Sequence, residues 1–145
     1  MIKIEKLDNA TDVAALLKLD HSGIKEVFTC EKTEWIQWLN TTLDSRTLDI
    51  FSITVDEELY AYYVLLNNVR PPISDGVTIF YFSTLIDVKD CDGNSAGEKA
   101  MLEIKKYAVE RKATKIIIFT RFPKVCEKYG FKEDQRVKRL SMGVN

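Results

Sequence analysis

The run from Val77 to Val88, VTIFYFSTLIDV, is the feature that most restricts how this chain can fold. Its side chains are mostly apolar or aromatic at both sets of alternating positions, and its one charged residue, Asp87, stands near its end. Neighbouring side chains of a strand point to opposite faces, so a strand with this pattern buries both of them. We therefore expect Val77–Val88 to be a central strand of a sheet that is covered on both sides.

The residues before this run predict three strands and two helices. Ile2–Leu7 alternates apolar and polar residues, which is typical of a half-buried strand. Two segments with helical periodicity follow, and then two strand-like runs that are joined by a polar turn at Asp56–Glu58. The expected helices are Asp8–Leu19 and Glu31–Leu43, and the expected further strands are Asp49–Val55 and Leu59–Leu66.

The residues after the run predict a helix, a strand, a second helix and a last strand, in the segments Ser95–Lys112, Lys115–Thr120, Lys124–Tyr129 and Phe131–Met142. The full order is β-α-α-β-β-β-α-β-α-β. An antiparallel meander of three strands followed by one β-α-β crossover makes a mixed, mostly antiparallel sheet. The expected fold class is therefore α/β, in the broad sense that includes α+β, with helices on both faces of the sheet.

The second predicted helix carries two tryptophans on one stripe. Trp35, Trp38, Leu39 and Leu43 share one face at helical spacing. The rings of such a stripe pack into a core or form the wall of a substrate site. We favour core packing, because an apolar stripe at this spacing is the ordinary way in which a helix contacts a sheet.

Size and composition favour one domain that spans residues 1–145. With 46% hydrophobic and 30% charged residues, a chain of 145 residues can bury a core without disulfides or metals. Three distant cysteines and a single histidine argue against a disulfide framework and against a zinc site. No apolar run has the length of a membrane span and no cleavable signal precedes the first strand, so we expect a cytoplasmic protein without membrane contacts.

Charge is distributed unevenly along the chain. Residues 1–60 carry 12 acidic and 6 basic side chains, whereas residues 61–145 carry 10 acidic and 15 basic ones. The basic excess is consistent with an anionic ligand or partner, although scattered, solvated lysines are the simpler explanation. The excess is too diffuse for nucleic acid binding, and no nucleic-acid-binding motif accompanies it. No nucleic acid partner is expected.

The stretch Lys124–Phe131, KVCEKYGF, has the pattern of a helix that ends just before a strand. Gly130 suits the left-handed conformation that ends a helix, and Phe131 suits the start of a buried strand. Many proteins of the GNAT N-acyltransferase superfamily have Tyr-Glu-Lys-Leu-Gly-Phe here, and the segment from Cys126 resembles that motif at four positions. The order of elements is similar to that of the superfamily over essentially the whole chain. The resemblance implies the GNAT fold and acyl transfer from acetyl-CoA, or another acyl-CoA, to an amine.

The resemblance also implies a cofactor site at the turn from the long strand into the long helix. In the family, backbone N–H groups of this turn hold the pyrophosphate of coenzyme A. The family's arginine and three glycines fall, in a gap-free register, on Gly93, Asn94, Ala96 and Glu98, so the phosphate loop is degenerate. The cofactor-binding residues that the resemblance implies are Asp87, Val88, Asn94, Ser95, Ala96, Gly97 and Arg121.

The same turn has an interpretation that needs no ligand. Ser95-Ala96-Gly97-Glu98 has the S-x-x-E pattern of a capping box, in which the serine accepts a backbone N–H bond and the glutamate reaches back. We favour this interpretation, although the small residues of the turn still leave room for a ligand.

The catalytic residues implied by the family are only partly present. A tyrosine of the closing motif generally protonates the leaving thiolate, and Cys126 stands at its position. A thiol can serve as such an acid, yet a cysteine on a helix also commonly packs in a core. Tyr129 is the alternative acid if the helix is rotated. No carboxylate lies between Asp75 and Asp87 to act as the base. His21 could be the base only if its loop folds over the cleft; otherwise we expect it to be a surface histidine.

Two functions of different class are therefore open. The first is an acyl-CoA-dependent N-acyltransferase whose acceptor, a small molecule or a protein amine, cannot be read from the chain. The alternative is a catalytically inactive GNAT-fold binding or structural module. Degenerate domains of that kind resemble small proteins encoded by phages, in which the fold persists while the phosphate loop changes.

Overall fold

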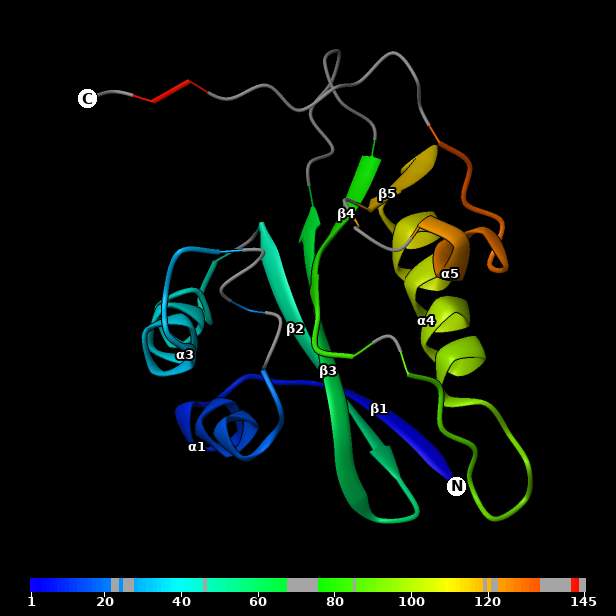
Figure 1. Ribbon diagram of the computed structural model, residues 1–145, viewed down its shortest axis with the longest axis horizontal. Helices are drawn as coiled ribbons and strands as arrows, with labels where there is room; N and C mark the ends of the chain where they lie inside the picture. Colours follow the sequence, from blue (N-terminus) through cyan, green and yellow to red (C-terminus); the bar gives the residue numbers. More distant parts are fainter. Residues whose placement is uncertain are drawn as a thin grey trace.

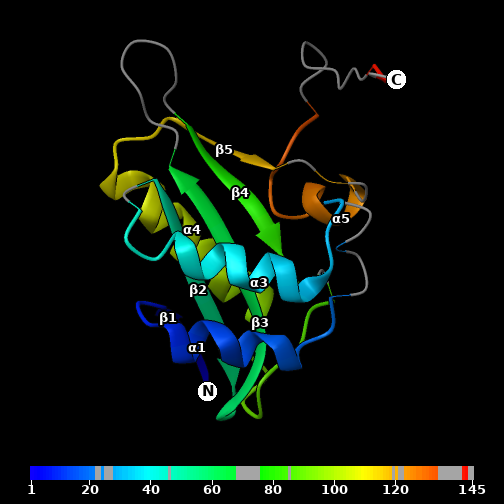
Figure 2. The same ribbon diagram turned by 90° about the vertical axis from the view of Figure 1, so that its left-hand side faces the viewer.

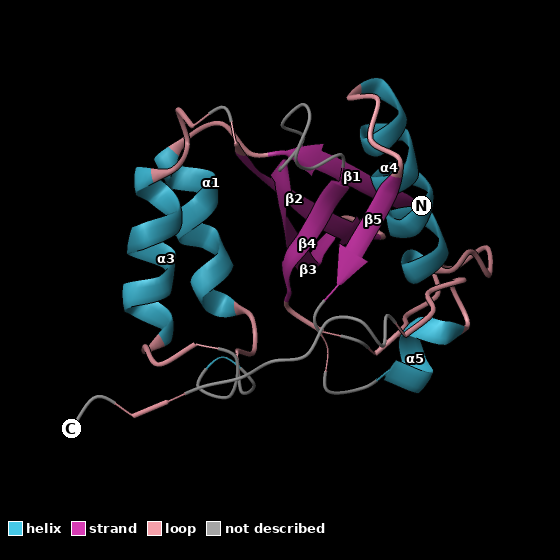
Figure 3. Cartoon of the chain, turned by 90° about the horizontal axis from the view of Figure 1, so that it is seen from above, coloured by secondary structure: helices cyan, strands magenta, loops and turns pink. Residues whose placement is uncertain are grey.

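The computed structural model describes residues 1–21, 24, 28–45, 47–67, 76–84, 86–118, 120, 123–133 and 142–143. One twisted sheet forms the middle of the molecule (Figure 1). Seen from above, α1 and α3 lie on one side of this sheet, and α4 and α5 lie on the other (Figure 3). The expected mixed architecture, with both faces of the sheet covered, is confirmed.

The sheet contains five described strands, arranged in the order in which they follow one another along the chain. The first four pair antiparallel, and the fifth pairs parallel to the fourth, as the predicted meander and crossover require. The strands are β1 (Ile2–Lys6), β2 (Leu48–Val55), β3 (Glu58–Asn67), β4 (Gly76–Phe82) and β5 (Lys115–Ile118).

The helices occupy the segments that their periodicity predicts, with the first one shorter than expected because it tightens into a 3-10 turn. They are α1 (Ala10–Ala14), η1 (Ala15–Lys18), α3 (Lys32–Thr41), α4 (Ala96–Glu110) and α5 (Pro123–Glu127). Asn9 caps α1, since its side-chain oxygen accepts the N–H of Asp12 at 2.9 Å. None of the described helices is both long enough and apolar enough to cross a bilayer.

Two hydrophobic cores lie on opposite faces of the sheet, and β3 contributes to both. Tyr62 and Val64 pack with α1 and α3, the two helices that cover the sheet in Figure 2. Tyr63 and Leu65 point the other way and pack with α4. All four side chains are at most 1% exposed. The apolar character of the central strands therefore reflects two buried faces, as predicted.

The turn between β2 and β3 is a two-residue hairpin at Asp56 and Glu57. Val55 pairs with Glu58, so only these two residues form the connection. Both have positive φ, 46° and 71°, as in the type I′ turn whose twist matches that of the strands it joins. The predicted short polar hairpin is confirmed.

β4 contains a β-bulge at Phe80. Tyr81 and Ile79 are opposite successive residues of β3, which leaves Phe80 as an extra residue. The bulge reverses the alternation of side chains, so that Ile79 packs with α4 and Tyr81 packs with α1 and α3. A bulge bends its strand. The described pairing of β4 with β5 ends at this point, with Ile79 opposite Ile118.

β4 ends at Phe82, and the expectation of a strand to Val88 was wrong. Side-chain hydroxyl groups bind the backbone directly after Phe82. The Ser83 hydroxyl accepts an N–H of β3 at 3.0 Å, and the Thr84 hydroxyl accepts the N–H of Ile86 at 3.1 Å. The N–H of Ser83 still donates to the Tyr62 carbonyl oxygen at 3.0 Å, so the chain leaves the sheet only after Ser83, and it then runs to the beginning of α4.

The last expected strand, Phe131–Met142, falls largely outside the described residues. Residues 131–133 belong to the described part and form neither helix nor strand. Phe131 packs against the core on the α4 side. A strand after residue 133 stays a prediction.

Candidate functional site

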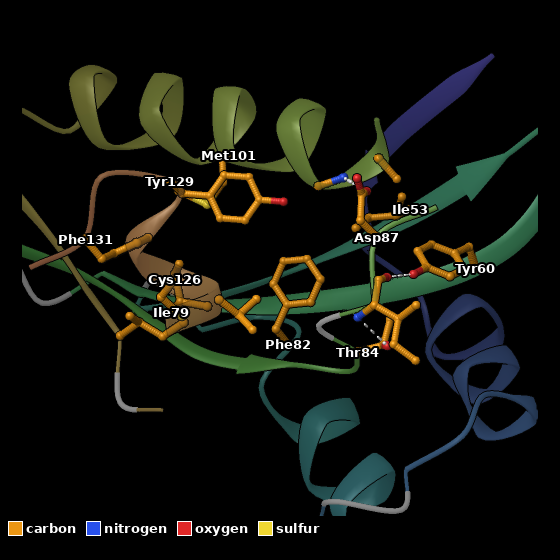
Figure 4. A pocket seen from close by; sticks show the side chains of 15 residues that line it. Ile53, Tyr60, Ile79, Phe82, Thr84, Asp87, Met101, Cys126, Tyr129 and Phe131 are labelled. Atoms are coloured by element: carbon orange, nitrogen blue, oxygen red, sulfur yellow. Dashed lines mark hydrogen bonds between the residues drawn. The ribbon is translucent and has the colours of Figure 1, made fainter. Parts of the chain in front are cut away.

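A pocket lies where the described pairing of β4 and β5 ends, beneath the first turns of α4 and beside α5 (Figure 4). Its free volume of about 50 Å³ is enough for a few water molecules or for the small end of a ligand. Most of the wall is apolar. The lining residues are Ile53, Tyr60, Ile79, Phe82, Thr84, Ile86, Asp87, Ala96, Gly97, Met101, Ile118, Val125, Cys126, Tyr129 and Phe131.

α5 and the turn after it bring both predicted acids to this pocket. Cys126 lines it from α5 and is only 5% exposed. α5 ends at Glu127, and Gly130, at a φ of +94°, closes the turn that holds Tyr129. The hydroxyl of Tyr129 is directed into the pocket (Figure 4). Tyr129 reaches the pocket from the turn after α5, where the helical periodicity has ended, and its role as the acid stays a prediction.

The hydroxyl of Tyr129 reaches α4 because residue 97 has no side chain. A Cβ atom at Gly97 would lie 2.3 Å from the Tyr129 hydroxyl oxygen and 3.2 Å from Oδ1 of Asp87. The first distance is far below van der Waals contact. Gly97 therefore provides the space in which the hydroxyl lies against the first turn of the helix.

Replacing Gly97 with alanine should act through Tyr129. We expect G97A to lower the free energy of unfolding by about 1–2 kcal/mol, because the new methyl group overpacks the site. In a Y129F background most of that loss should disappear, since the hydroxyl is gone. Urea unfolding of the wild type, both single variants and the double variant measures the coupling. A coupling energy near zero would contradict the contact.

Ser95 caps α4, as the capping-box pattern predicts. Its hydroxyl oxygen accepts the N–H of Glu98 at 3.1 Å. The structure adds a partner that the pattern does not contain: the Ser95 hydroxyl donates to Oδ2 of Asp87 at 2.7 Å. The cap is thus built from two segments, the helix start and the chain that leaves β4.

Asp87 is an anionic acceptor at the positive end of α4. Its Oδ1 accepts the N–H of Gly97 at 2.8 Å, and its Oδ2 accepts the Ser95 hydroxyl. Burial opposes ionisation, but the bonds from Ser95 and Gly97 outweigh it, and together with the charge of Lys128 they lower the pKa of Asp87. The ionised carboxylate also interacts favourably with the helix dipole.

The N–H groups of the first three residues of α4 are therefore bonded within the chain. They belong to Ala96, Gly97 and Glu98, and they donate to the Val88 carbonyl oxygen at 2.9 Å, to Asp87 at 2.8 Å and to Ser95 at 3.1 Å. In a phosphate-binding turn these are the groups that point at the ligand. Here each of them already has an acceptor.

A groove of about 470 Å³ lies outside the pocket and shares Asp87 and Tyr129 with it. Its other charged side chains are Glu98, Lys105 and Lys128. Two carboxylates and two ammonium groups thus line it. The groove connects solvent with the pocket and has no excess of positive charge.

Three further residues were predicted to bind the cofactor, and the structure describes two of them. Val88 uses its carbonyl oxygen in the bond from Ala96. Asn94 is held by Asp90, which accepts its backbone N–H at 2.8 Å and its side-chain amide at 3.2 Å. Arg121 lies outside the described residues. A contact of any of the three with a cofactor stays a prediction.

His21 is buried on the opposite face of the sheet, and the expectation of a surface histidine was wrong. Its Nδ1 lies 2.8 Å from the Leu19 carbonyl oxygen, so Nδ1 donates and Nε2 accepts from the Tyr62 hydroxyl at 2.7 Å. The Tyr62 oxygen in turn accepts the indole N–H of Trp35 at 2.8 Å. Burial lowers the pKa of His21, which favours the neutral ring. These bonds make His21 part of a core network, remote from the pocket.

The aromatic stripe of α3 packs mainly in the core, as predicted. Trp35 is 4% exposed, and its ring lies 5.3 Å from the ring of Tyr81 in β4. Trp38 stacks on Trp35 but is 44% exposed. Neither tryptophan lines the pocket at α4.

Solved structures with the same fold include several acetyltransferases. A probable acetyltransferase has a TM-score of 0.68 and 17% identity, over 100% of this chain and 98% of that chain. A predicted acetyltransferase with acetyl-CoA from Clostridium acetobutylicum has a TM-score of 0.67 and 19% identity, over 97% and 96%. A ribosomal-protein-alanine N-acetyltransferase from Brucella melitensis biovar Abortus 2308 has a TM-score of 0.66 and 16% identity, over 99% and 100%.

No protein-family model matches the chain, and no curated protein is similar to it in sequence. The structural similarity nevertheless covers nearly the whole of each compared chain. This protein therefore has the fold of the GNAT acetyltransferases, which confirms the fold that its element order and closing motif imply.

The two ends of coenzyme A fit this site unequally. The apolar pocket beside Tyr129 suits the thioester end of a pantetheine arm, and the outer groove gives that arm a path to solvent. The N–H groups of the first three residues of α4 already have acceptors, and one of these acceptors is the carboxylate of Asp87, whose charge repels a phosphate. The nucleotide end does not fit α4 in this arrangement.

Proposed function

We propose that this protein transfers an acyl group from a pantetheine thioester to an amine. The observation that carries the proposal is the pocket where the described pairing of β4 and β5 ends, with mostly apolar walls and the hydroxyl of Tyr129 inside. The fold supports it, since the similar structures are called acetyltransferases and one of them contains acetyl-CoA. Acetyl-CoA is the natural first donor to test.

In this reaction Tyr129 acts as the general acid. The amine attacks the thioester carbonyl, the new C–N bond forms, and the C–S bond breaks. The Tyr129 hydroxyl gives its proton to the leaving thiolate, and the proton that the attacking nitrogen loses as it becomes the amide nitrogen returns to Tyr129 through solvent. Cys126 lies in the same pocket but is buried among apolar side chains, which suits a packing role.

A second candidate function has one observation of its own. The N–H groups of the first three residues of α4 are bonded within the chain, and the acceptor of one of them is the carboxylate of Asp87. A domain that no longer holds a nucleotide-linked donor there would serve as a binding or structural module. On this alternative the pocket beside Tyr129 is only a packing gap.

Ligand binding and product formation separate the two functions. We expect both acetyl-CoA and S-acetylpantetheine to give saturable heat in calorimetric titrations and to raise the thermal unfolding midpoint. Thiol release in the presence of a panel of primary amines then tests acyl transfer. If neither thioester gives heat or a shift in the midpoint, the acyltransferase proposal falls and the binding module remains.

A further inference from the structure

We infer that the carboxylate of Asp87 takes the place of the donor's pyrophosphate at the start of α4, so that the protein recognises the pantetheine thioester without its nucleotide. This inference rests on the proposed function and specifies its donor. The donor class is then any acyl group on a pantetheine arm, whether or not the arm continues into coenzyme A.

The hydrogen bonds of Asp87 reproduce those of a bound phosphate oxygen. One carboxylate oxygen accepts a backbone N–H of the first helical turn at 2.8 Å, and the other accepts the Ser95 hydroxyl at 2.7 Å. An anion at a helix N-terminus is ordinarily held by such donors. With both of its oxygens bonded, Asp87 leaves neither donor free.

The surroundings of Asp87 also keep a second anion away. A phosphate group brought to the same N–H would meet a carboxylate at close range, and like charges at such distances repel each other. The groove outside offers Lys105 and Lys128, but Glu98 lies among them. The described charges thus give the nucleotide of coenzyme A little to bind.

The pocket can recognise a donor without contacting the nucleotide. It is shaped by Ile79, Phe82, Met101 and Tyr129, which contact the thioester end of a donor and carry no charge. Recognition by these side chains depends on the acyl group and the arm. The geometry therefore favours recognition of the acyl group and the pantetheine arm and disfavours binding of the nucleotide.

The direct test compares two donors on the full chain. We expect acetyl-CoA and S-acetylpantetheine to bind the wild type with dissociation constants within about threefold of each other, because the nucleotide gains no charge-assisted hydrogen bonds. In D87N the carboxylate charge is removed while an oxygen remains to accept the Gly97 N–H. Acetyl-CoA should then bind about tenfold tighter, because the repulsion between the carboxylate and the phosphates is gone, and the affinity for S-acetylpantetheine should change less than about twofold.

D92N is the matched control. Asp92 is an exposed aspartate of the same loop, and it lines neither the pocket nor the groove. Its replacement removes an equal charge without touching the Gly97 N–H, so the ratio of the two dissociation constants should stay at the wild-type value. A similar change in D92N and D87N would show a general charge effect and would overturn the inference.

The outcomes separate this inference from the proposed function. If the wild type binds acetyl-CoA more than about tenfold tighter than S-acetylpantetheine, the inference is overturned. This measurement uses the wild type alone and does not depend on the folding of a variant. A folded D87N with an unchanged ratio also overturns it, while the proposed function stands. If the wild type binds neither thioester, both fall.

Discussion

A Tyr129→Phe variant is expected to lose acyl transfer by about 100-fold or more, while it folds and binds the donor as the wild type does. The ring still fills its part of the pocket, so packing against α4 is retained. The missing hydroxyl removes the proton that the leaving thiolate needs. The measurement is thiol release at saturating donor and amine, together with the dissociation constant of the donor.

The control for this prediction is Cys126→Ala. Its thiol lies in the same pocket and is 5% exposed, so its loss should cost about 1 kcal/mol in stability and change the rate by less than about threefold. The two variants thus separate the two acids left open by the sequence. A 100-fold loss in C126A with an active Y129F would assign the acid role to Cys126.

The largest effect on stability is expected at Tyr62. Its hydroxyl donates to Nε2 of His21 and accepts the indole N–H of Trp35. Tyr62→Phe leaves both groups buried and unpaired, since His21 is 5% exposed and Trp35 4%. Each unsatisfied buried polar group costs about 1–3 kcal/mol, so we expect a loss of about 2–4 kcal/mol in the free energy of unfolding. Urea unfolding monitored by circular dichroism measures it.

Tyr63→Phe is the matched control on the same strand. Tyr63 is 1% exposed and points to the opposite face, and its hydroxyl has no hydrogen-bond partner among the residues that the structure describes. Its removal should therefore change the free energy of unfolding by less than about 1 kcal/mol. Equal losses in the two variants would mean that the hydrogen-bond network around Tyr62 is not what stabilises this side of the sheet.

Much of the fold could be predicted because the signals are local. The two-faced apolar pattern marks the central strands, and the polar turn at Asp56 marks the hairpin. Ser95 marks the start of α4, and the glycine at 130 marks the end of the closing turn. Each depends on residues that are close in sequence, so the same residues form the same element in many folds.

The end of β4 could not be predicted, although its residues are apolar. Val77–Val88 contains nothing that forbids a longer strand, and the bulge at Phe80 leaves no mark in the sequence. The Ser83 hydroxyl accepts the N–H of Tyr62 in the middle of β3, a contact between segments that are far apart in the sequence. The position of the pocket therefore could not be derived from the strand pattern.

Four of the residues that the sequence singled out lie together in the structure, but how they contact one another could not be predicted, and their roles stay predictions. Cys126, Tyr129, Gly97 and Asp87 were all singled out, and all line the pocket. Family resemblance made Asp87 a ligand contact, whereas its bonds to Ser95 and Gly97 make it part of the cap. No spacing in the sequence shows that an aspartate before a loop reaches the helix after it.

By itself, the sequence determined a layered sheet with helices on both faces, because alternation, helix periodicity and caps act over short distances. Only the tertiary structure decided that the hydroxyl of Tyr129 lies in the space left by Gly97, and that Asp87 accepts the N–H of Gly97 at the start of α4. These contacts join the start of α4 to the segment after β4 and to the turn after α5. Their relative positions depend on how the sheet and helices pack, and local sequence patterns do not determine that packing.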